Sequence, residues 1–574
     1  MAWFRSYDQL DAVAARARCR TRRRLAVIGI SFLVLVAVVV GIVVSTGKHE
    51  SDDDRSSDNA AASFSSSIKL LCDRALHPDE CRSSLNQAAA NATALDPTKI
   101  FQLAVQIAID ELAKVPAVFG NLASNKSLDN FTAAALAECS ELTLLAVESL
   151  DETLSATNNL TSTDTIGDLK TWMSAAITDQ STCIDDMERA SPAVKATVVE
   201  PLANSSIFSS NALAIFNEVS NFLDQFKQRR LTSTSPPSFH QRHRPFPAWV
   251  SRHDRKLLES ADVMKDADIV VAKDGSGKYR TINDALRAVP KKSSRRTLVY
   301  VKKGVYKENV KVEKKLWNVM MVGDGKKATI ITGSLNVVDG TPTFQTATLA
   351  VFGKGFIARD IGIRNTAGAA KHQAVAMMSK SDLSVFYRCS FDAFQDTLYS
   401  HSNRQFFREC DIIGTVDFIF GNAAVVYQAC NILPRAPMAN QFDTITAQGR
   451  VDPNQNTGIS IHDCNIEANG EVAGVDIYLG RPWKPYAVTV IMKSTMAGII
   501  DSKGWMAWTE NTAPDTIFYS EYQNRGPGSS TKNRVKWKGV KTMTAAQANK
   551  FAVAQFIGGK SWLPHVGVPF TVDL

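Results

Sequence analysis

Apolar residues recur every three or four positions through most of residues 63–228, most clearly in segments 100–112 and 131–150. This period is typical of amphipathic helices that bury one face against their neighbours. Prolines that follow His77, Asp96 and Ser191 are expected to interrupt the helices. The pattern therefore predicts an all-α four-helix bundle over residues 63–228.

From residue 267 onward the pattern changes to short runs of β-branched and aromatic residues. Four segments share the order apolar, three variable residues, Cys, one variable residue, apolar; they are 385–391, 406–412, 426–432 and 460–466. Segment 355–363 fits the same frame if Asp360 takes the place of the cysteine. A repeat of about 20 residues in a β-rich chain predicts a solenoid, here an all-β parallel β-helix over residues 259–574.

The repeated cysteines, Cys389, Cys410, Cys430 and Cys464, are spaced by 21, 20 and 34 residues. We interpret the long interval as one coil with an insertion, a polar loop within residues 434–450. Cys410 and Cys430 are one coil apart, so their Cα atoms are expected to lie ~4.8 Å apart, within reach of a disulfide. Pairing of Cys430 with Cys464 is the open alternative, because the insertion hides how many coils separate them.

Two aspartates share one phase of this repeat, since Asp396 follows Cys389 by seven residues and Asp417 follows Cys410 by seven. Equivalent residues of successive coils stack ~4.8 Å apart, so the two carboxyl groups are expected to be neighbours. Stacked carboxylates repel, and one of them tends to keep a proton, which makes an acid and a nucleophile or base from identical groups.

Other side chains extend this hypothesis. Gln395 is a neutral donor beside Asp396. Four phenylalanines, at 391, 394, 418 and 420, are expected to line the surroundings of the two aspartates. Arg481 and Trp483 offer a cation and an aromatic face for an acidic sugar. Such residues serve glycoside hydrolysis, or acyl transfer with an Asp nucleophile and amide oxyanion donors. The residues alone do not choose between these reactions, and a structural pair is the commoner meaning of two in-phase aspartates.

Residues 25–44 are 20 consecutive residues without a charge, long enough to cross a bilayer. Seven arginines lie within residues 1–24, so this basic tail is expected to stay in the cytoplasm and the rest of the chain to face the lumen or the exterior. The segment is either a retained signal anchor or a cleaved signal peptide. Both interpretations place the chain in the secretory pathway.

The cysteines agree with export, because eight of the nine follow this segment. Cys72 and Cys81 are close enough in sequence to join one hairpin, and Cys139 and Cys183 are candidates to join two long helices. Five Asn-x-Ser/Thr sites are candidates for glycosylation, all of them before residue 229: Asn91, Asn125, Asn130, Asn159 and Asn204.

Charge divides the chain into blocks, with a net charge of −14 over residues 48–228, +6 over 229–258 and +11 over 259–574. The middle block is rich in Pro, Ser and Arg and lacks periodicity, so it is predicted to be a linker. Its basic clusters, at 229–231 and 255–258, are candidate processing sites. The acidic and basic blocks are expected either to attract each other or to leave the basic one for a polyanion.

Several motifs resemble those of plant-type pectin methylesterases: GVYKE (304–308), HQAVAM (372–377), QDTLY (395–399), GTVDFIFG (414–421), AQGR (447–450) and LGRPW (479–483). The resemblance covers about residues 265–570. Residues 63–220, with their paired cysteines, resemble the pectin methylesterase inhibitor domain. Together the two resemblances imply a pro-enzyme whose catalytic part is a right-handed parallel β-helix.

The resemblance also implies roles. Asp417 is the expected nucleophile toward the C6 methyl ester of a galacturonate, and Asp396 the general acid and then the base. Gln395 and Gln373 are the expected oxyanion donors, whereas Thr343, Arg481 and Trp483 are expected to contact substrate.

The implied partners are methylesterified homogalacturonan, the chain's own helical region in cis and separate inhibitor proteins, and the implied location is the cell wall or apoplast. Before processing, the chain would also be attached to a membrane through residues 25–44. Neither a metal, nor an organic cofactor, nor a nucleic acid is implied.

Overall fold

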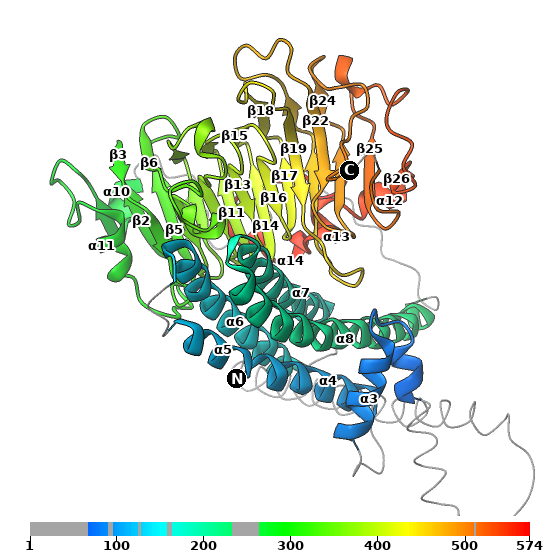
Figure 1. Ribbon diagram of the computed structural model, residues 1–574. Helices are drawn as coiled ribbons and strands as arrows, with labels where there is room; N and C mark the ends of the chain where they lie inside the picture. Colours follow the sequence, from blue (N-terminus) through cyan, green and yellow to red (C-terminus); the bar gives the residue numbers. More distant parts are fainter. Residues whose placement is uncertain (1–66, 90–95, 124–127, 158–162, 232–262, 510–511) are drawn as a thin grey trace, which may run out of the picture.

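Two domains lie against each other in the computed structural model, a helical domain and a long β-helix (Figure 1). The structure describes residues 67–89, 96–123, 128–157, 163–231, 263–509 and 512–574. The predicted membrane segment 25–44 lies outside these ranges, as does most of the predicted linker 229–258. Within them, no helix combines the length and the apolar character needed to cross a membrane.

The helical domain begins with a short helix over residues 67–72. It continues as α3 (Pro78–Ala88), α4 (Pro97–Leu112), α5 (Val115–Ala123), α6 (Asn130–Ala156), α7 (Thr163–Asp186), the 3-10 turn η2 (Met187–Arg189) and α8 (Pro192–Leu231). The three prolines expected to interrupt the helices each begin one, where a missing N–H costs no hydrogen bond. Helix α8 extends three residues into the segment predicted as linker.

Both predicted disulfides of the helical domain are confirmed. Cys72 is bonded to Cys81 with their Cα atoms 5.7 Å apart, and Cys139 of α6 is bonded to Cys183 of α7 with their Cα atoms 4.9 Å apart. The second bond fixes α7 against α6. Of the five candidate glycosylation sites, Asn130 and Asn204 are exposed and the other three lie outside the described residues.

Three parallel sheets build the β-helix, as the repeat predicts. The 11-stranded sheet contains β1 (Ile269–Val271), β2 (Thr297–Val301), β5 (Val319–Gly323), β8 (Ile357–Arg359), β11 (Ser384–Tyr387), β14 (Arg404–Arg408), β17 (Ala424–Gln428), β20 (Gly458–His462), β23 (Val488–Met492), β25 (Phe518–Tyr522) and β26 (Val540–Lys541). The seven-stranded sheet contains β4 (Val310–Val312), β7 (Leu349–Val351), β10 (Met377–Ser379), β13 (Leu398–Ser400), β16 (Ile419–Gly421), β19 (Asp443–Gln448) and β22 (Ile477–Pro482). The eight-stranded sheet contains β3 (Gly304–Lys307), β6 (Thr329–Gly333), β9 (Gly362–Asn365), β12 (Ser390–Asp392), β15 (Asp411–Gly414), β18 (Asn431–Pro434), β21 (Asn465–Ile466) and β24 (Thr495–Met496).

Short helices complete this domain: α10 (Val263–Asp266), α11 (Ile282–Arg287), η3 (Thr343–Thr346), η4 (Ala369–Lys371), η5 (Pro527–Ser529), α12 (Ala545–Asn549), α13 (Val553–Phe556) and α14 (Gly559–Val566). Two of them, α13 and α14, pack apolar side chains against the outer face of the 11-stranded sheet. The outer face of the seven-stranded sheet is covered instead by the helical domain.

The cysteine repeat marks one position of the coil. The prediction that Asp360 occupies this position in segment 355–363 is wrong by one residue. The register pairs Ala358 with Phe386 and Gly362 with Ser390, so Ile361 takes the position of Cys389. Asp360 stacks on Arg388 instead, and both have positive φ, +58° and +52°. The Arg388 guanidinium donates to the Asp360 carboxylate at 2.8 and 2.6 Å. The apparent match arose because the left-handed turn residue directly precedes the cysteine.

The predicted disulfide between Cys410 and Cys430 is also wrong, since both are buried free thiols, as are Cys389 and Cys464. The alternative pairing of Cys430 with Cys464 does not form either. Side chains at equal positions of parallel strands point the same way and remain ~4.8 Å apart, whereas the two Cβ atoms of a disulfide lie ~3.5–4.5 Å apart. Being one coil apart in phase is therefore not sufficient for a bond.

The long interval before Cys464 is one coil with an insertion, because β17 pairs directly with β20. The insertion is not a single loop over residues 434–450. Strand β19 (Asp443–Gln448) occupies the second part of that segment, and the additional residues are divided between the connections on its two sides.

Candidate active site

Asp396 and Asp417 lie at the same turn position in neighbouring coils. Leu398 of β13 pairs with Ile419 of β16. Asp396 lies two residues before Leu398, and Asp417 lies two residues before Ile419. Both have positive φ, +63° and +52°, a conformation that Asp tolerates better than most residues. Their residual exposure is 7% and 4%. The two carboxyl groups are thus stacked, as the repeat predicts, and largely withdrawn from water.

The Asp417 carboxylate has three donors. Arg481 donates from Nε to Oδ1 at 2.9 Å and from Nη2 to Oδ2 at 2.7 Å. The Thr444 hydroxyl donates to Oδ1 at 2.6 Å and accepts the backbone N–H of Asp417 at 2.8 Å. A bidentate guanidinium fixes both the charge and the plane of a carboxylate. Asp417 is therefore held in one orientation as an anion.

Asp396 has a different environment. Burial raises its pKa well above the ordinary value, and the nearby charge of Asp417 raises it further, whereas Arg481 acts in the opposite direction. Two carboxyl groups that differ in this way divide into one protonated acid and one anion. The arrangement supplies a nucleophile and a general acid side by side.

All seven residues predicted for the site line one cleft of about 520 Å³: Thr343, Gln373, Gln395, Asp396, Asp417, Arg481 and Trp483. Aromatic rings form much of its wall. Tyr399 stacks on Phe420 with ring centroids 4.1 Å apart, and Trp508 lies over the Arg481 guanidinium at 4.2 Å. A hydrophobic wall of this kind suits the faces of sugar rings.

Sequence reasoning placed some aromatic residues wrongly. Of the four phenylalanines expected near the aspartates, only Phe420 lines the cleft. Phe391 and Phe418 belong to the interior of the β-helix, and Phe394 packs under Arg435. Strand alternation around Tyr399 and Thr444 could have indicated their role, but no pattern marked Trp508.

Among the described residues, no group of three or more His, Cys, Asp or Glu side chains is arranged to hold a metal ion.

Comparison with known proteins agrees with this geometry. Residues 268–560 match the family model "Pectinesterase", and residues 66–215 match "Plant invertase/pectin methylesterase inhibitor". The chain belongs to the pectinesterase family. It is 50% identical over 99% of both chains to "Putative pectinesterase/pectinesterase inhibitor 24" of Arabidopsis thaliana, and 47% identical to "Pectinesterase 3" of Phaseolus vulgaris, over 93% of this chain and 92% of that one.

Among solved structures, the carrot pectin methylesterase is 53% identical with a TM-score of 0.53. The match covers 54% of this chain and 98% of the carrot chain. A pectinesterase fold of that extent therefore exists without a helical domain. This chain is a pectinesterase with an N-terminal inhibitor-like domain, which agrees with the resemblance that its motifs predicted.

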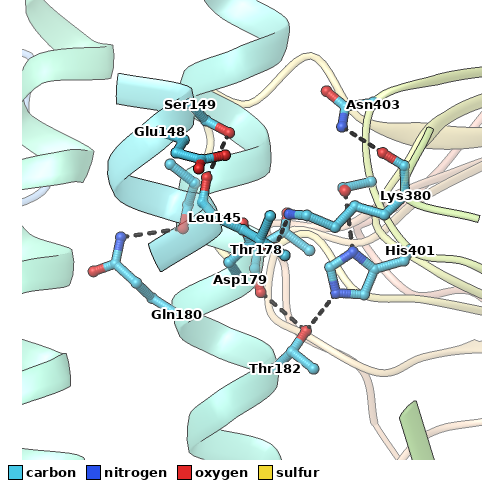
Figure 2. Close-up of polar contacts among 12 residues, drawn as sticks. Leu145, Glu148, Ser149, Thr178, Asp179, Gln180, Thr182, Lys380, His401 and Asn403 are labelled. Atoms are coloured by element: carbon cyan, nitrogen blue, oxygen red, sulfur yellow. Dashed lines mark hydrogen bonds and ion pairs between the residues drawn. The ribbon is translucent and has the colours of Figure 1, made fainter. Parts of the chain in front are cut away.

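The inhibitor-like domain forms part of the wall of the pectinesterase cleft. Six of its residues line the same cavity as the aspartates: Phe131, Thr182, Asp185, Asp186, Glu188 and Arg189. The Thr182 hydroxyl is 2.9 Å from Nε2 of His401, as the close-up of this contact shows (Figure 2). Lys484 of the cleft forms an ion pair with Asp185. The helical domain thus closes one side of the active site.

Proposed function

We propose that Asp417 and Asp396 carry out the pectinesterase reaction, the hydrolysis of C6 methyl esters of homogalacturonan to pectate and methanol. The observation that supports this most is the difference between the two stacked carboxyl groups. Asp417 is anionic and oriented by Arg481, whereas the pKa of Asp396 is raised by burial. Neither group needs an external cofactor for this role.

In the first half of the reaction, an Asp417 oxygen attacks the ester carbonyl carbon. The oxyanion that forms accepts hydrogen bonds from the amides of Gln395 and Gln373, which line the cleft. Asp396 donates its proton to the departing methanol, leaving an acyl-enzyme on Asp417.

In the second half, the Asp396 carboxylate takes a proton from water, and the resulting hydroxide attacks the acyl carbon. The Asp417 carboxylate leaves and returns to its hydrogen bonds with Arg481 and Thr444. Trp483, Thr343 and the aromatic wall hold the sugar residues during both steps.

The helical domain is proposed to keep the enzyme inactive until the linker is cut. Its side chains line the cleft, so a polymer cannot occupy that side while the domain is bound. Cutting after Leu258 would leave a catalytic chain that starts at Glu259. N-terminal sequencing of the secreted enzyme tests this site, and a single start near Ser45 or Ser63 would contradict it.

The destination proposed for the chain is the cell wall, reached through the secretory pathway. The support is the apolar segment 25–44, the two disulfides of the helical domain and the exposed acceptor residues Asn130 and Asn204. Separate inhibitor proteins are proposed to occupy the surface that the cis domain leaves after cleavage.

The test of the chemistry pairs methanol release with melting temperature. Asp417→Asn is expected to abolish turnover because an amide cannot attack the ester, and Asp396→Asn to impair it severely. Gln395→Ala is expected to cost roughly 10²–10³-fold in turnover, the effect of one oxyanion donor. A folded Asp417→Asn protein that releases methanol at a near wild-type rate would overturn the assignment. A purely structural role would instead make activity follow the folded fraction.

A further inference from the structure

A second cavity, of about 340 Å³, lies between the two domains next to the catalytic cleft. Helix α6 forms one wall of it, and β4, β7, β10 and η3 of the β-helix form the other. Phe344 lines both this cavity and the catalytic cleft. We call it the α6 cavity. Because each domain supplies one wall, the cavity is complete only while the helical domain is docked.

The α6 cavity contains a buried carboxyl group, that of Glu138. Its exposure is 2%, and neither of its oxygens accepts a hydrogen bond from the residues that the structure describes. The amide nitrogen of Gln345, which also lines the cavity, donates instead to the Ala134 carbonyl at 3.1 Å. Burial raises the pKa of Glu138, and the neighbouring carboxyl of Asp186 raises it further. A buried carboxylate without a donor or a cation is unfavourable, so this end of the cavity favours a positively charged ligand.

An ion pair lies where the α6 cavity opens to solvent. Lys311 and Glu141 are 2.7 Å apart, with exposures of 48% and 44%. The Lys311 ammonium also lies over the ring of Phe352, 4.8 Å from its centroid. Lys311 is thus engaged at the opening, and within the described ranges Glu138 belongs to no ion pair. Together with Asp186, three carboxyl groups surround the cavity and its inner end, against the one cation in its lining.

The remaining wall is aromatic and aliphatic, which indicates the kind of cation that fits. Aromatic faces attract organic ammonium ions, and apolar walls favour alkyl chains. Hard metal ions instead need several oxygen ligands, and in the described ranges no group of three or more His, Cys, Asp or Glu side chains is arranged to hold one. The apolar residues of the wall that are at most 6% exposed include Phe344, Ala347, Phe352 and Met378.

We propose that the α6 cavity binds a linear alkyl diammonium ion, which holds the helical domain on the β-helix. One ammonium group donates to the Glu138 carboxylate, the alkyl chain lies along the apolar wall beside Phe352, and the second ammonium group reaches Glu141 at the opening. A ligand that binds only the docked state stabilises that state by mass action. The inference concerns docking, so it does not depend on the roles proposed for Asp417 and Asp396.

The test measures the Kd between the two domains of the full chain after cutting at a specific protease site inside residues 232–262. The probe is 1,4-diaminobutane, added at neutral pH and constant ionic strength. Docking is expected to become about 10-fold tighter when the diamine is present at about ten times its own Kd. Neither 1,4-butanediol, an uncharged molecule of the same length, nor MgCl2 at the same concentration is expected to tighten docking. Added NaCl should weaken it, because salt screens the exposed ion pairs between the domains.

Glu138→Gln is expected to abolish the effect of the diamine, because an amide does not attract an ammonium group as a carboxylate does. Its matched control is Glu152→Gln, on an exposed part of α6, which should respond like wild type. Ala350→Leu narrows the cavity from β7 and should also abolish the effect, so it serves if Glu138→Gln docks poorly. A wild-type Kd that the diamine does not change would overturn the proposal. Equal tightening in Glu138→Gln, or by MgCl2, would overturn it as well.

Discussion

Two faces of the β-helix are covered by helices, but the two covers differ in chemistry. On the 11-stranded sheet, Trp562 and Leu563 of α14 pack into an apolar cluster with residues such as Phe406, beside uncharged hydrogen bonds such as that from Gln428 to the Thr571 carbonyl. On the seven-stranded sheet, apolar contacts at Tyr399 are accompanied, among the described residues, by five interdomain ion pairs, such as Lys380–Asp179, and by hydrogen bonds such as Asn422 to Thr178, at 2.9 Å.

The apolar contact of α14 therefore corresponds to permanent association, and the polar contact of the helical domain to removable association. Apolar side chains that lose their cover are driven back to it by the hydrophobic effect, so α14 is an integral part of the fold. Charged and polar groups regain water when they separate, which lowers the free energy cost of separation. The polar cover lies over the active site, and the apolar one lies on another sheet.

The largest effect is expected from a substitution in α14, which packs permanently on the 11-stranded sheet. Trp562→Ala removes a buried ring and its hydrogen bond to the Ile557 carbonyl, 2.9 Å long. We expect a loss of about 3–5 kcal/mol in the free energy of unfolding of the β-helix. Urea unfolding of the catalytic domain measures it, with exposed Leu335→Ala as the control. A loss below that of the control would show that α14 is not integral.

An effect no larger than this is expected from the polar contact between the two domains, and it should appear in docking. Asp179→Ala leaves the Lys380 ammonium buried without its partner, which costs about 3–5 kcal/mol for a fully buried pair. Adding Lys380→Met to Asp179→Leu should restore most of the docking. The measurement is retention of the helical domain after the linker is cut. If the single variant docks as tightly as wild type, the pair does not hold the cover in place.

The pH dependence of docking should be smaller still. Burial and the neighbouring Asp186 raise the pKa of Glu138 well above its usual value, and burial raises the pKa of Asp186 to about 6. Because both pKa values are raised in the docked state, this contribution is complete below about pH 4 and is lost as the pH rises through 6. Lys484 and its partner Asp185 face the same cleft and limit the size of the change.

Retention of the cut helical domain from pH 4 to 7.5 measures this dependence. Glu138→Gln with Asp186→Asn should flatten the profile, whereas Asp151→Asn with Glu152→Gln, on an exposed part of α6, should leave it unchanged. Stronger docking at neutral than at acidic pH in the wild-type chain would contradict the assignment.

Much of this molecule could be predicted because local patterns agreed with the tertiary structure. The Cys389 and Cys410 repeat determined the coil, and the coil placed Asp396 above Asp417. The thiols did not pair because bonding depends on the direction of the Cβ atoms, which a spacing in sequence does not contain. Asp360 was placed wrongly for another reason, since the left-handed turn residue and the cysteine position that follows it differ by a single residue in the sequence.

For the interdomain surface, only the sign of the charge on each side could be predicted. Opposite net charges indicated that the two blocks attract each other, but not which side chains meet. Lys380 and Asp179 are 201 residues apart, and only the packing of α7 on the β-helix brings them together. Trp508 enters the cleft from a loop without any periodic pattern, so the sequence contained no local signal for it.

The closure of the active site by the helical domain is tested most directly by methanol release from methylesterified pectin, measured on the full chain with a specific protease site inside residues 232–262. We expect no release before cutting, little while the cut helical domain remains bound, and full release once that domain is removed in high salt and the salt is exchanged. Full activity of the uncut chain, with the helical domain still docked, would contradict the claim that a removable polar cover closes the active site.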